Sequence, residues 1–143
     1  MVDRALLARR VAAVRDAVAR IGEMLPSEPG SLAGDRTVRE VVILNLFVAV
    51  QECLALATHW LADAGWEVPS AYGQVFVALA EHEIIDAPLA ARLAAAAGLR
   101  NLIAHRYGAL DWLRIHAVAS EDLDDLLEFC AALARQVQDG SVN

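Results

Sequence analysis

The sequence predicts an all-α fold: an up-and-down bundle of four to five helices in a single domain over residues 1–143. Apolar residues make up 57% of the chain and charged residues 22%, which is typical of a globular protein with one core. Alanine and leucine, both strong helix formers, dominate the apolar set. Aromatic residues are only 6%, and β-branched residues form no alternating run, so a sheet-rich fold is not expected.

The first helix is predicted from Asp3, a residue that caps helices well, to about Leu25. Apolar residues recur at helical spacing from Leu6 to Ile21, and arginines occupy the opposite face. The segment Pro26–Gly34 contains two prolines, two glycines and two serines, a composition that predicts a loop.

The second helix is predicted over Asp35–Ala64, and Gly65 suits its end. Its middle, VVILNLFVAV, is apolar nearly all round, which predicts burial on more than one side. Asn45, Glu52 and His59 follow one another at intervals of seven and therefore share a face. That face is either the solvent-exposed side of the helix or a polar stripe that lines a cleft.

Three further helices complete the predicted bundle. A short one fits Ala71–Glu83, and Pro88 suits the first turn of the next, which continues into the motif described below. Gly108 interrupts that pattern. The last helix is predicted over Asp111–Gln138, with Ser120 as the place of a kink or a fresh start.

The charge balance limits the classes of partner. The formal net charge is −7, and all 12 basic residues are arginine. Broad, non-specific nucleic-acid binding needs a basic surface and is therefore not expected. Residues 1–20 nevertheless hold five arginines against two aspartates, so a local basic face is compatible with the sequence.

Neither a metal centre nor a cofactor is expected from the sequence. Cys53 and Cys130 form no CxxC pair and look like small buried hydrophobes. Charges interrupt the first ten residues where a signal peptide needs its apolar core. The apolar run Val41–Val50 is short for a membrane span, which takes about 20 residues. We therefore expect a cytoplasmic protein without a membrane partner.

Four polar residues near the predicted end of the fourth helix are the candidate site. Arg100 and Tyr107 are seven residues apart and nearly eclipse on a helix, and Asn101 and His105 form a neighbouring stripe. Guanidinium binds phosphate through paired hydrogen bonds, and imidazole transfers protons near neutral pH. Cleavage of RNA by its own 2′-hydroxyl needs both functions and no metal. Without further information, cations at a helix C-terminus more often serve the helix dipole.

The pattern Arg100-x4-His105-x-Tyr107 resembles the R-x(4–6)-H-x-Y motif of HepT-like toxins of the HEPN superfamily. The surrounding run LRNLIAHRYGALD is similar to that family too. So is the order of elements: a long apolar helix with a Gln51-Glu52 step, a short helix, the motif helix and an acidic last helix. The resemblance covers roughly residues 1–138.

The resemblance implies a helical homodimer in which the motif helices of two subunits meet, and a toxin that is a metal-independent endoribonuclease acting on tRNA or mRNA. Arg100 and His105 would be the catalytic pair, and Asn101 would support them. Tyr107 would be adenylylated, and thereby silenced, by a partner nucleotidyltransferase antitoxin. From its position in the sequence, Glu52 is also expected to face the motif, together with His59.

Two other interpretations stay open. One is a non-catalytic HEPN module that binds a nucleotide or a nucleotidyltransferase partner protein. The other is a plain structural bundle. Of the remaining residues, His82 is expected to be a solvated helix end, and His116 has no evident partner. Trp112 is the best candidate for stacking on RNA, because it lies just past the motif.

Overall fold

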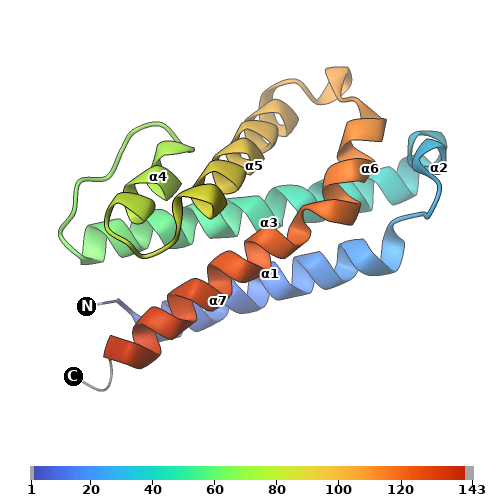
Figure 1. Cartoon of the computed structure of the whole chain (residues 1–143). Coiled ribbons are helices and arrows are strands. Elements are labelled where there is room, and N and C mark those ends of the chain that lie inside the picture. The colour runs from blue at the N-terminus through green and yellow to red at the C-terminus, as the bar shows by residue number, and fades with distance from the viewer. Residues whose placement is uncertain (1, 141–143) are drawn as a thin grey trace.

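The computed structural model describes residues 2–140 and is all-helical over that range, with seven α-helices, one 3₁₀ helix and no strand (Figure 1). The predicted fold class is confirmed. The helices are α1 (Arg4–Met24), α2 (Pro29–Gly34), α3 (Arg36–Asp63), α4 (Gln74–Glu81), α5 (Ala87–His105), η1 (Tyr107–Ala109), α6 (Trp112–Glu121) and α7 (Leu123–Gly140).

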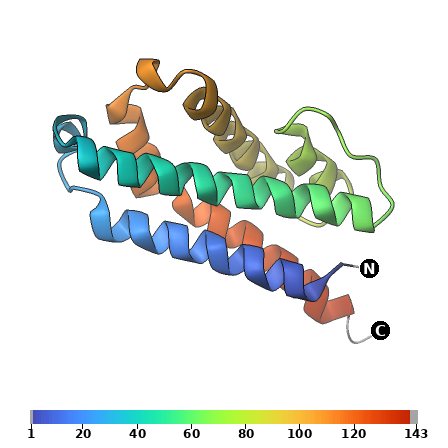
Figure 2. The ribbon, with the colours of Figure 1, turned by 180° about the vertical axis from the view of Figure 1, so that it is seen from behind.

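The bundle is built around α3. Helices α1 and α3 run side by side over most of their lengths, and the start of α1 and the end of α7 lie at the same end of the bundle (Figure 2). Helices α4, α5, α6 and α7 also contact α3, so it is buried on more than one side, as its apolar middle predicts. By length and composition alone α3 is able to cross a membrane, although half of its most apolar stretch is buried inside this bundle.

Four aspartates fix where four of the helices begin. The carboxylates of Asp3, Asp35, Asp86 and Asp111 accept hydrogen bonds from the first backbone N–H groups of α1, α3, α5 and α6. These N–H groups have no partner inside their own helix, so a capping carboxylate stabilises each start. The end of α3 is set by Gly65, whose φ of 75° lies in the left-handed region that glycine adopts readily.

The structure has more α-helices than the four to five predicted, because two segments fold differently from the prediction. The predicted loop Pro26–Gly34 contains α2, which has Pro29 in its first turn and packs on α6 through the fully buried Leu32. The predicted last helix is divided into α6 and α7 at Asp122. The hydroxyl of Ser120, where a break was predicted, bonds to the carbonyl of His116 inside α6.

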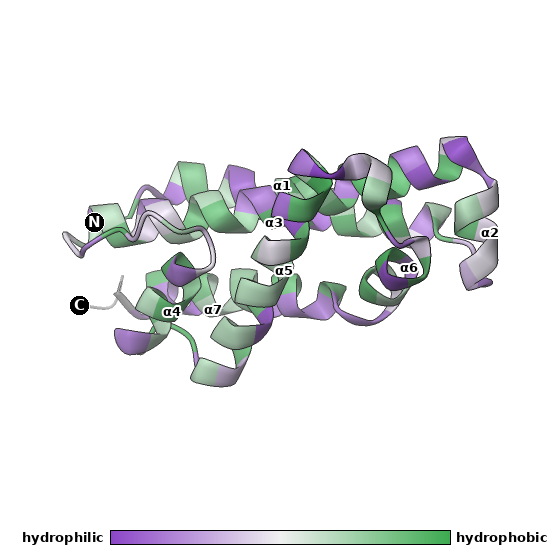
Figure 3. Ribbon diagram, turned by 90° about the horizontal axis from the view of Figure 1, so that it is seen from above, coloured by the Kyte–Doolittle hydropathy of each residue, from purple (hydrophilic) through white to green (hydrophobic). Residues whose placement is uncertain are grey.

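The short helix α4 is narrower than the predicted Ala71–Glu83. It begins at Gln74 and ends at Glu81, because Glu83 takes a positive φ of 61° that no α-helix continues through. Beneath it the core is continuous, and Phe76 meets Phe129 of α7 edge to face at a centroid distance of 5.3 Å. Cys53 and Cys130 are both buried, as predicted. The ribbon of α5 is mostly green, the colour of hydrophobic residues, in the view from above (Figure 3), and its residues Leu93 and Ala97 are buried in the core.

Candidate active site

The guanidinium of Arg100 is held by side chains from two helices. Its Nε donates a hydrogen bond of 2.8 Å to Oε1 of Gln51 on α3, and its Nη1 donates one of 3.0 Å to Oδ1 of Asn101, the next residue on α5. Both acceptors are part-buried amide oxygens. Asn101 therefore lies where the sequence places it, beside Arg100, and orients it.

Aromatic rings lie against the same guanidinium. The Cζ atom of Arg100 is 4.8 Å from the ring centroid of Phe47 and 4.9 Å from that of Tyr72. A cation is attracted to the face of an aromatic ring. Because a guanidinium has five N–H groups and two are used by Gln51 and Asn101, three remain to bind an oxyanion. Arg100 is thus a fixed and still available cation.

His105 is the last residue of α5 and its side chain is exposed. Within residues 2–140 the imidazole makes no hydrogen bond, so both ring nitrogens are open to a ligand. The helix ends because Arg106 leaves helical geometry, with φ of −139° and ψ of 42°, while its N–H still bonds to the carbonyl of Leu102. His105 and Arg100 consequently lie on the final turns of one rigid element.

Tyr107 does not lie on the motif helix, contrary to the prediction that it eclipses Arg100. It begins the 3₁₀ turn η1, after the end of α5 at His105, and is 44% exposed. Its ring meets that of Trp112 on α6 edge to face, with centroids 6.0 Å apart. The Cζ atom of Arg39 on α3 lies 5.4 Å from the Trp112 ring. Tyr107 therefore belongs to a separate aromatic and basic cluster.

The polar residues of α3 do not form one cleft. Asn45 donates to the carbonyl of Val41 in its own helix, and Nε2 of His59 lies 2.9 Å from Oδ2 of Asp63. Glu52 faces α1, where Oε2 accepts a hydrogen bond of 2.8 Å from Arg10. The expectation that Glu52 and His59 face the motif is therefore wrong for this chain, because their contacts lie elsewhere.

Gln51, which was not predicted as a site residue, is the α3 residue that forms a hydrogen bond with Arg100. Its place next to Glu52 turns it about 100° around the helix, away from the predicted stripe and towards α5. Phe47 is one helical turn earlier on the same side. A signal for Gln51 existed in the sequence, since a polar side chain directly after an apolar run of the helix needs a partner when it is buried.

Two other histidines have structural partners that the sequence did not reveal. His116 is 7% exposed, and its Nε2 lies 2.7 Å from the carbonyl oxygen of Pro26, which ties α6 to the segment between α1 and α2. The ring of His82 stacks on Trp66 with centroids 3.7 Å apart. His82 is thus a stacked rather than a simply solvated residue, although it remains exposed.

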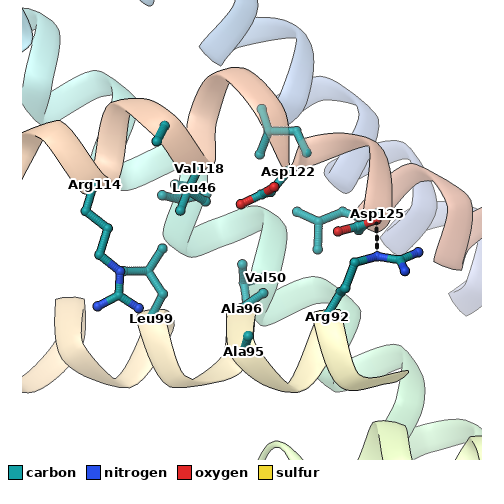
Figure 4. A pocket seen from close by; sticks show the side chains of 13 residues that line it. Leu46, Val50, Arg92, Ala95, Ala96, Leu99, Arg114, Val118, Asp122 and Asp125 are labelled. Atoms are coloured by element: carbon teal, nitrogen blue, oxygen red, sulfur yellow. Dashed lines mark hydrogen bonds and ion pairs between the residues drawn. The ribbon is translucent and has the colours of Figure 1, made fainter. Parts of the chain in front are cut away.

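A nearby pocket is separate from the motif. It has a volume of about 370 Å³, lies between α3, α5, α6 and α7, and has apolar walls such as Leu46 and Leu99 (Figure 4). At one end Arg92 forms an ion pair of 2.9 Å with Asp125. Neither Arg100 nor His105 lines it. Among residues 2–140, no group of three or more histidine, cysteine or acidic side chains is placed to hold a metal ion.

The sequence matches a known family over most of its length. The profile described as "Ribonuclease HepT-like" matches residues 10–133. The chain is 26% identical over 124 residues to the mRNA nuclease HepT of Shewanella oneidensis, an alignment that covers 87% of this chain and 92% of that protein.

The fold is similar to that of solved toxins. A tri-AMPylated HEPN toxin of Shewanella oneidensis in complex with an MNT antitoxin superposes with a TM-score of 0.84 and 25% identity, covering 91% of this chain and 97% of that one. YutE, a cytosolic protein of unknown function from Bacillus subtilis, gives a TM-score of 0.84 at 11% identity, covering 97% and 93%. The latter likeness concerns the fold alone.

Proposed function

Since this chain belongs to the HepT-like ribonuclease family, we propose that it is the toxin of a toxin–antitoxin pair and that it cleaves RNA through Arg100 and His105. The relative from Shewanella is named an mRNA nuclease, and the similar solved toxin is bound to an antitoxin. The observation that carries the proposal is the fixed guanidinium of Arg100, which keeps three N–H groups free on the same helix as an exposed histidine.

The chemistry follows from these two side chains. Arg100 binds the non-bridging oxygens of a phosphodiester and stabilises the charge that develops on them. His105 takes the proton of the ribose 2′-hydroxyl, whose oxygen then bonds to phosphorus while the bond from phosphorus to the 5′-oxygen breaks. The leaving oxygen receives a proton from a second, protonated imidazole or from water. The products are a 2′,3′-cyclic phosphate and a 5′-hydroxyl end.

We further propose that two copies of the chain assemble with their motif helices together. One surface of α3 supports this: Leu44 is 61% exposed, and Phe47 and Val48, which follow it on the same side, are only partly buried. Exposed apolar surface next to a polar site is typical of an interface. A second copy would also supply a second His105, so that one imidazole acts as base and the other as acid.

Tyr107 is proposed as the residue that a nucleotidyltransferase antitoxin adenylylates. Its ring is 44% exposed, and within the described part of the chain its hydroxyl makes no hydrogen bond. In the step, the phenol oxygen bonds to the α-phosphorus of ATP, pyrophosphate leaves, and the phenol proton passes to solvent. The added anion would stand two residues from His105 and oppose the entry of RNA through charge and bulk. We place both partners in the cytoplasm.

The test is RNA cleavage by the purified chain, freed of any antitoxin, in the presence of EDTA. The wild type should cleave RNA, and Arg100→Ala and His105→Ala should lose at least about a hundredfold in rate, the scale of a lost acid–base group. Tyr107→Phe should cleave but resist adenylylation. The matched control is His82→Ala, which removes another exposed histidine and should retain activity. Intact RNA with the folded wild type would favour the non-catalytic binding module.

A further inference from the structure

A second polar cluster lies at the N-terminal end of α3, beside Tyr107. Its centre is Trp112, which is partly buried at the start of α6 and lies between Tyr107 and Arg39. The Tyr107 ring is 6.0 Å from the Trp112 ring, and Cζ of Arg39 is 5.4 Å from it. Arg39 of α3 thus meets the segment Tyr107–Trp112, which is distant from it in sequence.

Arg39 is an available cation at this place. Its Nη1 donates a hydrogen bond of 2.6 Å to the carbonyl of Ala33, which anchors the side chain, but no carboxylate among the described residues pairs with it. Its remaining N–H groups are therefore free for an anion. By contrast, the neighbouring Arg36 forms an ion pair of 2.7 Å with Glu40.

Arg36 nonetheless lies within electrostatic range of Tyr107. The hydrogen bond and the charge of Glu40 raise the pKa of Arg36, and the phenol oxygen of Tyr107 adds to this in its ionised form. Arg36 is thus placed to attract a negative charge on Tyr107. A phosphodiester on the Tyr107 oxygen would be such a charge, and Arg39 reaches the same place through its contact with Trp112.

We propose that Arg39, Arg36 and the ring of Trp112 form a docking site for a nucleotide that is joined to Tyr107 through a phosphodiester. The arginines bind the phosphate, as guanidinium groups do, and the indole offers a surface on which a base stacks. The inference rests on the proposed adenylylation of Tyr107 and adds to it a regulatory role: the cluster keeps the adduct in place and slows its removal.

The test measures how fast a phosphodiesterase releases the nucleotide from modified Tyr107, followed by intact mass. Each protein is first adenylylated by its antitoxin with ATP and then separated from it. Arg39→Gln should release the nucleotide about tenfold faster than the wild type, the equivalent of about 1.4 kcal/mol. Arg39→Lys should be intermediate, because it keeps the charge but not the paired N–H groups. Arg9→Gln, at an exposed arginine on α1, is the control.

A second measurement uses the wild type alone and so stands even if Arg39→Gln does not fold. Salt screens exposed charges, so release from the wild type should accelerate between low and high ionic strength. Equal rates in the wild type, Arg39→Gln and Arg9→Gln, or a wild-type rate that salt does not change, would overturn the proposal. If Arg39→Gln is folded but never modified, Arg39 binds the antitoxin instead, and this result also overturns the docking site.

A wild type that accepts no nucleotide would overturn the adenylylation and the docking site together. Cleavage of RNA by the unmodified chain tests the nuclease activity independently of both.

Discussion

Arg100 and Gln51 lie on different helices, yet Nε of Arg100 donates a 2.8 Å hydrogen bond to Oε1 of Gln51. This contact, with the bond to Asn101, fixes the plane of the guanidinium before any substrate arrives. A preorganised cation costs no reorganisation during a reaction, so its support would contribute to the rate of the proposed RNA cleavage.

Gln51→Ala should therefore weaken catalysis without removing a catalytic residue. We expect kcat/KM for RNA to fall about five- to tenfold, the equivalent of about 1 to 1.4 kcal/mol for a part-exposed bond to a charged group. Glu52→Gln is the matched control on the neighbouring residue, because Glu52 contacts Arg10 and not the motif. The opposite pattern, with Glu52→Gln inactive and Gln51→Ala unaffected, would restore Glu52 as the supporting residue.

Tyr72 is the exposed partner of the Arg100 guanidinium, at 4.9 Å from its Cζ atom. Tyr72→Ala should lower kcat/KM about two- to fivefold, because an exposed cation–π contact is worth about 0.5–1 kcal/mol. Tyr72→Phe keeps the ring and should be close to the wild type. An increase in activity for Tyr72→Ala would show instead that this ring obstructs the approach of RNA.

His116 should matter for stability and not for cleavage. Its replacement by phenylalanine leaves the carbonyl of Pro26 without the 2.7 Å partner that it has now. The free energy of unfolding should fall by about 1–2 kcal/mol, measured by urea denaturation. Leu113→Ala, at a residue of the same helix that is 61% exposed, should change it by less than about 0.5 kcal/mol. An unchanged midpoint for His116→Phe would contradict this role.

Both thiols should be inert in the native protein. Cys53 and Cys130 are 0% and 1% exposed, so a reagent in solution cannot reach either sulfur. Their mutual hydrogen bond raises the pKa of the Cys53 thiol, which leaves less of its reactive thiolate at neutral pH, and lowers the pKa of the Cys130 thiol, so burial alone protects Cys130. A thiol-specific reagent should label neither residue at pH 7 and both after unfolding in guanidinium chloride. Rapid labelling of the native protein would show that α7 detaches readily from α3.

Local signals in the sequence predicted most of the fold. A capping aspartate such as Asp3 and a helix-ending glycine such as Gly65 determine helix ends through contacts within a few residues. The structure has both helix ends where the sequence predicts them. The short helix α2 was missed, because its proline and glycine content predicts a loop and only the tertiary burial of Leu32 reveals it.

The roles of the site residues named from the sequence remain a prediction, and the structure adds their geometry. Arg100 and Asn101, which were expected on neighbouring stripes of one helix, are joined by a hydrogen bond. The contacts of Gln51 and Tyr72 with Arg100 depend on how α3 and the segment before α4 pack on α5, and no local pattern contains that information. Tyr107 was misplaced because helical spacing was extended beyond the last turn of α5.

The continuous helix α3 also sets the distance between the Arg100–Gln51 contact and the cluster around Trp112. Arg39 and Gln51 are twelve residues apart on it, which at 1.5 Å per residue is a separation of about 18 Å along its axis. At about 3.4 Å per stacked nucleotide, this is the length of about five nucleotides of a single strand. An RNA strand that contacts both Arg100 and Arg39 must therefore have about that length. A single nucleotide joined to Tyr107 would reach only Arg39.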